Sequence, residues 1–356
     1  MTVIRTYHTM LAQIQHIVPT GHVYRQRVLA WFMTGIYLGR TVNTAKVANK
    51  ISGRAKRASN SRRLSRFLAN GAVRVRAWYE STMTALLQAA ASSGQVRLII
   101  DATQVAQSHQ LLMVALAYRR RALPIAWTWV RVAKGHSSGG KQVALLGYVQ
   151  RLMPPQVMVV LTGDSEFTPL QAQLEKWGWF YVLRQKGSHL YRSHPDQPWQ
   201  RVGTLLDHPG QQCWLSAIEL TEQNRLPCNF LAYWRQGEKQ PWLLATNLPS
   251  ARQTLQQYKV RAWIEEMFGD FKRHGVELQQ SHLRHFLRLS RLTLVVALLY
   301  VWVVAFGSAV IKRGDRHLVD RIDRRDLSIF RIGYDMLERC LINNLPASFR
   351  QVPYFT

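Results

Sequence analysis

The chain has 356 residues, 47% of them hydrophobic, which is enough for a large core shared among two or three lobes. Its formal charge of +27 indicates a polyanionic partner, nucleic acid first and an anionic membrane second. The three cysteines have no metal-ligand spacing and make no even disulfide set, and the N-terminus has no signal-peptide pattern, so we expect a cytoplasmic protein and not a disulfide-framed secreted one.

Residues 1–92 are predicted to form a basic helical DNA-binding domain. Two short helices, at 44–51 and 61–68, are joined by a basic turn, with Ser59 or Ser61 as a plausible N-cap. The charge is almost entirely of one sign, because a single glutamate stands against Arg5, Arg25, Arg27, Arg40, Lys46, Lys50, Arg54, Lys56, Arg57, Arg62, Arg63, Arg66, Arg74 and Arg76. The alternative is a basic solvated bundle with no specific partner.

Residues 93–186 are predicted to be the first part of an α/β core. The pattern changes to three hairpin-connected strands followed by helix, strand, helix and strand. These segments lie at 96–101, 111–117, 125–132, 141–153, 157–161, 168–177 and 180–184. The order is typical of a ribonuclease-H-like (retroviral-integrase-like) mixed sheet, in which the first and fourth strands are central neighbours.

Two aspartates stand where such strands end. Asp101 closes the first strand, and Asp164 follows the fourth. If these strands are neighbours, both carboxyl groups meet at one edge of the sheet. Taken alone, each aspartate is better explained as a turn residue at the end of a strand.

The connection before the first core helix has the spacing of a phosphate loop, from Gly135 to Gly140 and Lys141. Gln142 stands where that motif has Ser or Thr to hold Mg²⁺. We therefore interpret the segment as a plain connection between the third strand and the helix.

Residues 187–250 are predicted to be a β-rich insertion, with strand-like runs at 212–220, 229–234 and 242–246. The segment is rich in Trp, Gln, Pro and Gly. Its aromatic residues are first of all candidates for hairpin or core packing. They include Trp199, Trp214, Trp234 and Trp242.

A helix is predicted for residues 258–272, which contain no proline and only one late glycine. At 100° per residue, Tyr258, Arg261, Glu265 and Lys272 share a polar strip about 60° wide. A carboxylate between two cations suits a metal ion beside a phosphate. The alternative is a solvated helix face with ordinary ion pairs.

Residues 251–311 complete the predicted core, and their run at 292–311 carries no charge. By length this run is a transmembrane candidate. We predict a buried helix, because the run stands alone in the chain and includes Gly307 and Ser308. Residues 312–356 are predicted to be a charged helical tail that binds a partner or forms a dimer.

The spacing of the polar strip resembles the Tyr-Arg-Glu-Lys signature of DDE transposases of the insertion-sequence four family. All four letters match at the family's spacing. The resemblance implies a catalytic, metal-binding set of carboxylates, Asp101, Asp164 and Glu265, and a DNA-binding set, Tyr258, Arg261 and Lys272. Two other acids are candidates for the same metal-binding role. Glu166 is a possible rival ligand beside Asp164, and Glu266 is a weaker candidate than its neighbour Glu265.

The resemblance also implies a function. The protein would be the transposase of a bacterial insertion sequence, which binds terminal inverted repeats and performs cut-and-paste transposition by DNA cleavage and strand transfer. It would use two Mg²⁺ ions, for which Mn²⁺ can substitute, and would act as a homodimer on double-stranded DNA from transposon ends and target, near the nucleoid and away from membranes. An insertion tryptophan would stack on a flipped base. Two alternatives stay open, a non-cleaving DNA-binding protein with the same fold and a basic membrane-associated protein.

Overall fold

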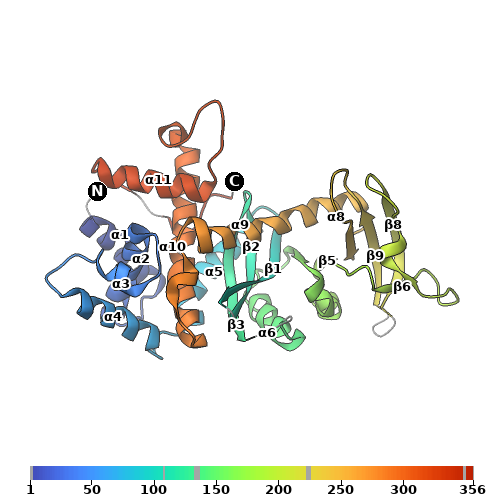
Figure 1. The fold of residues 1–356 in the computed structure, drawn as a ribbon, viewed down its shortest axis with the longest axis horizontal. Coiled ribbons are helices and arrows are strands. Elements are labelled where there is room, and N and C mark those ends of the chain that lie inside the picture. The colour runs from blue at the N-terminus through green and yellow to red at the C-terminus, as the bar shows by residue number, and fades with distance from the viewer. Residues whose placement is uncertain (1–2, 107–108, 132–136, 222–225, 348–349, 356) are drawn as a thin grey trace.

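The computed structural model describes residues 3–106, 109–131, 137–221, 226–347 and 350–355. Within these residues the protein is built on one ten-stranded mixed sheet, in the order β3-β2-β1-β4-β5-β10-β9-β8-β6-β7 (Figure 1). The core strands are β1 (Gln95–Ala106), β2 (His109–Tyr118), β3 (Arg121–Arg131), β4 (Met158–Gly163) and β5 (Phe180–Arg184). Strand β1 pairs antiparallel with β2 and parallel with β4, and β4 pairs parallel with β5.

The neighbouring positions of the first and fourth strands, predicted from the sequence, are confirmed by the pairing of β1 with β4. Both strands carry runs of aliphatic residues that are buried, as expected for parallel strands covered on both faces. On one face, Gly163 lies so close to Ile100 and Phe167 that a Cβ would come within 3.0 Å of each. Helices α6 (Gly139–Gln150) and α7 (Gln171–Lys176) pack on that face, where both contact the 3-10 turn that carries Phe167. Asp101 follows Ile100 in β1, so its side chain points to the opposite face.

The N-terminal residues form five helices, so the prediction of helix is confirmed. They are α1 (Val3–Ile17), α2 (Val23–Gly39), α3 (Thr44–Ala48), α4 (Arg57–Ala69) and α5 (Val75–Ala91). The predicted caps are wrong, because α4 begins before Ser59 and Ser61, after Lys56, which makes no side-chain cap bond. Asn43 caps α3 by accepting hydrogen bonds from the next helical N–H groups. These helices share one continuous apolar core with the sheet.

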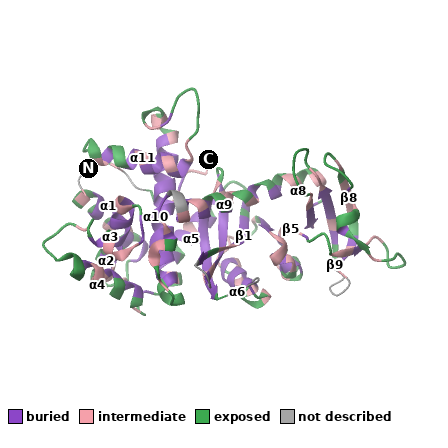
Figure 2. Ribbon diagram, in the orientation of Figure 1, coloured by how far each residue is buried: buried purple, intermediate pink, exposed green. Residues whose placement is uncertain are grey.

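The predicted insertion is β-rich, as expected, and contains β6 (Leu190–Arg192), β7 (Gln200–Arg201), β8 (Gln212–Leu220), β9 (Leu226–Tyr233) and β10 (Trp242–Thr246). It has its own small apolar core. It is not a separate sheet, however, because β10 pairs antiparallel with β5 and extends the central sheet outward (Figure 1). Figure 2 shows buried residues running from the central strands into this extension.

The predicted helix over 258–272 is present but composite. It consists of α8 (Ala251–Tyr258), a 3-10 turn (Lys259–Arg261), α9 (Ala262–Gly269) and a π-helical turn (Asp270–His274). In Figure 1 these segments run back from the insertion across the middle of the sheet. In a 3-10 turn the chain advances about 120° per residue instead of 100°.

The apolar run at 292–311 belongs to α10 (Phe286–Lys312). Among the described residues this is the one helix long and apolar enough to cross a membrane, and 94% of its most apolar window is buried in the protein (Figure 2). The predicted burial is therefore confirmed. The C-terminal tail packs α11 (Ile329–Ile342) against α10, but residues 319–328 contain no helix, so the prediction of a helical tail is only partly right.

Candidate active site

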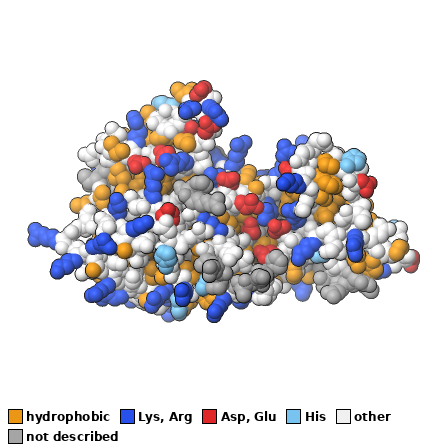
Figure 3. Space-filling view, in the orientation of Figure 1, with side chains coloured by type: hydrophobic (Ala, Val, Ile, Leu, Met, Phe, Trp, Pro, Cys, Tyr) orange, Lys and Arg blue, Asp and Glu red, His pale blue; other side chains and the backbone are white. Residues whose placement is uncertain are grey.

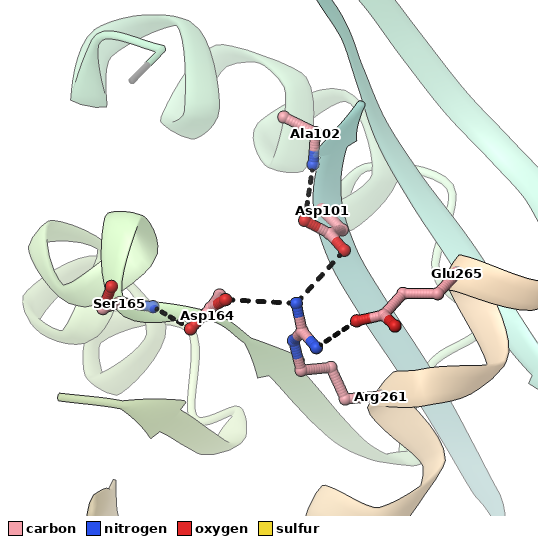
Figure 4. A network of polar contacts seen from close by, with 6 residues as sticks. All are labelled: Asp101, Ala102, Asp164, Ser165, Arg261 and Glu265. Carbon is pink, nitrogen blue, oxygen red and sulfur yellow. Dashed lines mark hydrogen bonds and ion pairs between the residues drawn. The ribbon is translucent and has the colours of Figure 1, made fainter. Parts of the chain in front are cut away.

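Three carboxylates surround one guanidinium group beside the paired strands β1 and β4 (Figure 4). Nη2 of Arg261 lies 3.4 Å from Oδ2 of Asp101 and 3.1 Å from Oδ2 of Asp164, and Nη1 lies 2.5 Å from Oε1 of Glu265. Because Oδ2 of Asp101 and Oδ2 of Asp164 both contact Nη2 of Arg261, the two oxygens can be no farther apart than the sum of their distances to that nitrogen. Metal ions roughly 4 Å from each other can span such a separation.

Each carboxylate is fixed by the element that carries it. Asp101 lies within β1, where its Oδ1 accepts the N–H of Ala102 at 2.8 Å. Asp164 directly follows β4, and its Oδ1 accepts the N–H of Ser165 at 2.8 Å, which caps the next turn. Glu265 stands on α9 one helical turn after Arg261, so the two side chains share a face. The local structure thus aims all three groups at one point.

The electrostatics of the cluster follow from partial burial. Burial raises the pKa of Asp101 to about 6, although the Arg261 guanidinium and the Ala102 N–H both lower it. Burial also opposes the charge of Arg261, but Asp101, followed by Tyr258 and the other two carboxylates, raises the pKa of this guanidinium overall. Arg261 is therefore a permanent cation that partly neutralises a buried acid.

The cluster lies in an open hollow of about 650 Å³. Lys272 lines the same hollow, and its Nζ lies 2.5 Å from the hydroxyl of Thr103, two residues beyond Asp101 on β1. Figure 3 shows acidic side chains gathered in the hollow between the larger body and the β-rich end, with Lys and Arg side chains beside them. A negatively charged centre with a basic margin is suited to cations held beside a polyanion.

Tyr258 is placed differently from the prediction. Its side chain is 4% exposed and packs edge-on against Trp242, with ring centroids 5.1 Å apart. Burial raises the pKa of its phenol to about 12. Of the four residues on the predicted strip, Arg261, Glu265 and Lys272 line the hollow, whereas Tyr258 does not.

The two rival acids are placed differently from each other. Glu266 lines the hollow and forms an ion pair with Arg121 at 3.2 Å, whereas Glu166 does not line the hollow. The four candidate tryptophans do not line it either. Trp199 lies beneath Arg192 and Trp234 donates to the Glu238 carbonyl, both within the insertion, and Trp242 packs against Tyr258. The loop that resembles a phosphate site lies partly outside the described residues, since 132–136 are not described.

The sequence interpretation also missed a buried carboxylate outside the hollow, that of Asp270. It is buried, accepts a hydrogen bond from Nε of Arg121 at 2.9 Å and another from the hydroxyl of Tyr300 at 3.2 Å. Burial raises its pKa to about 6, and Arg121 opposes that rise. The sequence has no local signal for this cluster, because Arg121 and Asp270 are 149 positions apart.

The carboxylate cluster fits a divalent cation in its chemistry. Carboxylate oxygens are preferred ligands of Mg²⁺, and these three already surround a positive charge. Over the described part of the chain, no three His, Cys, Asp or Glu side chains are arranged to hold a metal directly. At this site an oxygen of each carboxylate contacts the guanidinium of Arg261, which lies between them.

Comparison with known proteins adds little. No protein-family model and no curated protein matches the sequence. Among solved structures, a cryo-EM structure of a piggyBac transposase synaptic complex with hairpin DNA is similar, with a TM-score of 0.49 and 10% sequence identity over 97% of this chain and 83% of that chain. A similarity of this size carries no argument about function, which therefore depends on the geometry of the site.

Proposed function

We propose that this protein is a DDE transposase of an insertion sequence, with a ribonuclease-H-like core. The observation that carries the proposal is the convergence of Asp101, Asp164 and Glu265 on one cation. The strand order β3-β2-β1-β4-β5, with β1, β4 and β5 parallel, supports the fold assignment. The spacing from Tyr258 to Lys272 supports the family resemblance.

In this proposal, Asp101, Asp164 and Glu265 hold two Mg²⁺ ions, or Mn²⁺ in their place. When bound, the ions supply an activated water or 3′-hydroxyl and stabilise the leaving oxygen of a DNA strand. Arg261 leaves the carboxylates and turns to a phosphate oxygen, which suits a planar guanidinium. Lys272, at the margin of the same hollow, contacts a neighbouring phosphate.

The partner in this proposal is double-stranded DNA, from transposon ends and from the target. The net charge of +27 supports it. Helix α4 supports it too, because Arg57, Arg62 and Arg66 are exposed on its surface. Action as a homodimer in a bacterial cytoplasm belongs to the same proposal and follows from the family resemblance.

The test is strand cleavage of DNA that carries the inverted repeats flanking the gene, with and without Mg²⁺. The matched pair Glu265→Gln and Glu266→Gln differs only in which neighbouring carboxylate is lost. We expect Glu265→Gln to abolish nicking and to keep DNA binding, and Glu266→Gln to keep both. If the unmodified protein binds the repeats but never nicks them, the alternative of a non-cleaving DNA-binding protein is correct.

A further inference from the structure

The tip of the β2–β3 hairpin has an unusual backbone. Tyr118 pairs with Arg121, so the loop between the strands consists of Arg119 and Arg120 alone. Their φ angles are 42° and 62°. A two-residue loop with positive φ at both positions normally uses Asn-Gly, because side chains with a Cβ are strained there. A loop of two arginines is therefore less stable at these φ angles than an Asn-Gly loop would be.

The strained tip is held in place from both sides. Arg121 is 12% exposed and forms ion pairs with Glu266 at 3.2 Å and Asp270 at 2.9 Å. On the other strand, the hydroxyl of Tyr118 donates to the carbonyl of Tyr354 at 2.5 Å. The hairpin cannot relax by swinging away, and it presents the exposed Arg119 and Arg120 from a fixed position.

The tip forms one wall of a groove of about 860 Å³, and the segment before α11 forms the other wall. Arg325 is exposed on that second wall, and the partly buried Trp263 lines the groove. Among the described residues, Arg119, Arg120 and Arg325 have no ion-pair partner.

The acids of the groove do not cancel its charge. Glu266 is paired with Arg121, and Asp326 is paired with Arg324 at 3.1 Å. The groove thus keeps a positive excess. Glu266 also lines the hollow of the carboxylate cluster, so the two concave surfaces meet across α9.

We infer that this groove binds the phosphate backbone of duplex DNA, as a contact surface distinct from the carboxylate cluster. The inference rests on the proposed function and names a surface that the function alone does not. Guanidinium groups pair with phosphate oxygens in a bidentate manner, and arginines on two facing walls match a backbone with closely spaced charges. DNA that runs from the carboxylates across α9 would enter the groove directly.

The strain gives the inference a test with two readouts of opposite sign. The substitution pair Arg119→Asn and Arg120→Gly installs the favoured loop sequence and removes both guanidinium groups. We expect the melting temperature to rise and the affinity for a fluorescent duplex to fall. A purely structural role for the two arginines predicts unchanged DNA binding, and that result would overturn the inference.

The salt dependence of binding separates a specific contact from a general loss of charge. The plot of log affinity against log salt falls less steeply by about 0.9 for each phosphate contact that is lost. We expect a decrease of about two for the loop variant and about one for Arg325→Gln. The matched control is Arg151→Gln with Lys176→Gln, which removes two exposed charges from the ends of α6 and α7, on the other face of the sheet.

The outcomes also distinguish this inference from the proposed function. Equal decreases in the loop variant and the control would refute the groove as a DNA site while leaving the transposase proposal intact. If the unmodified protein binds no DNA at any salt concentration, the proposed function itself is wrong, and the groove proposal fails with it.

Discussion

The position of Arg261 among three carboxylates leads to a prediction about stability and pH. The change is Arg261→Gln, made in the presence of a chelator. It removes the cation that lies 3.4 Å from Asp101, 3.1 Å from Asp164 and 2.5 Å from Glu265. Removing one partner of a buried ion pair can destabilise a protein by about 3–5 kcal/mol. The pKa of Asp101 sets an upper limit on the part of the loss that comes from its pairing with Arg261.

The reason is that Asp101 can take up a proton when its partner is removed. Its folded pKa of about 6 lies above the ordinary aspartate value of 3.8, so folding favours the protonated form. The stability gained by protonation is full at low pH and is lost as pH rises through about 6. At about pH 7.5, protonating Asp101 in the unmodified protein costs about 2 kcal/mol, and this value is the most that its pairing with Arg261 can contribute.

The other two carboxylates contribute less, because Asp164 is 35% and Glu265 is 56% exposed. Exposed ion pairs contribute up to about 1 kcal/mol each. We therefore expect Arg261→Gln to lose about 2–3 kcal/mol at about pH 7.5 and about 1 kcal/mol at about pH 5. The measurement is urea or thermal unfolding at the two pH values in one salt concentration.

The matched control is Arg331→Gln, which breaks a surface ion pair of 2.7 Å with Asp335. It should lose under about 1 kcal/mol and show no difference between the two pH values. The reasoning about Asp101 is refuted if Arg261→Gln is equally destabilising at both pH values, or if it does not destabilise the protein at all.

Three further predictions test other parts of the structure. Asp270→Ala leaves a 12% exposed arginine short of a partner, so we expect a loss of about 3 kcal/mol in the free energy of unfolding, seen as a lower melting temperature. Gly333→Ala places a Cβ 2.0 Å from the carbonyl oxygen of Val303 and forces α10 and α11 apart, so we expect the free energy of unfolding to fall by about 3 kcal/mol. In the control Gly140→Ala the new Cβ meets nothing within 4 Å, so this substitution should be tolerated. Mg²⁺ at ten times its Kd should stabilise the unmodified protein by about 1.4 kcal/mol, and Asp101→Asn should lose that shift; an equal shift in both would show that the metal binds elsewhere.

Much of the fold follows from local patterns in the sequence. The strand-helix order of the core, the three main strands of the insertion and the burial of 292–311 are all present in the structure. These features depend on the period of apolar residues within a few positions, which the sequence records directly. The prediction that Asp101 and Asp164 come together depended on strand order, and both lie against Arg261.

The tertiary structure decided what local periodicity cannot specify. Tyr258 packs in the interior against Trp242, the insertion extends the central sheet, and Asp270 pairs with Arg121. The place of Arg261 is the main example, because it contacts carboxylates 160 and 97 positions away. The sequence by itself determined which residue types are available for the site. Only the folded chain decided that the cation lies between the acids, because the energy of an ion pair depends on distance in space and on burial, and neither is fixed by spacing along the chain.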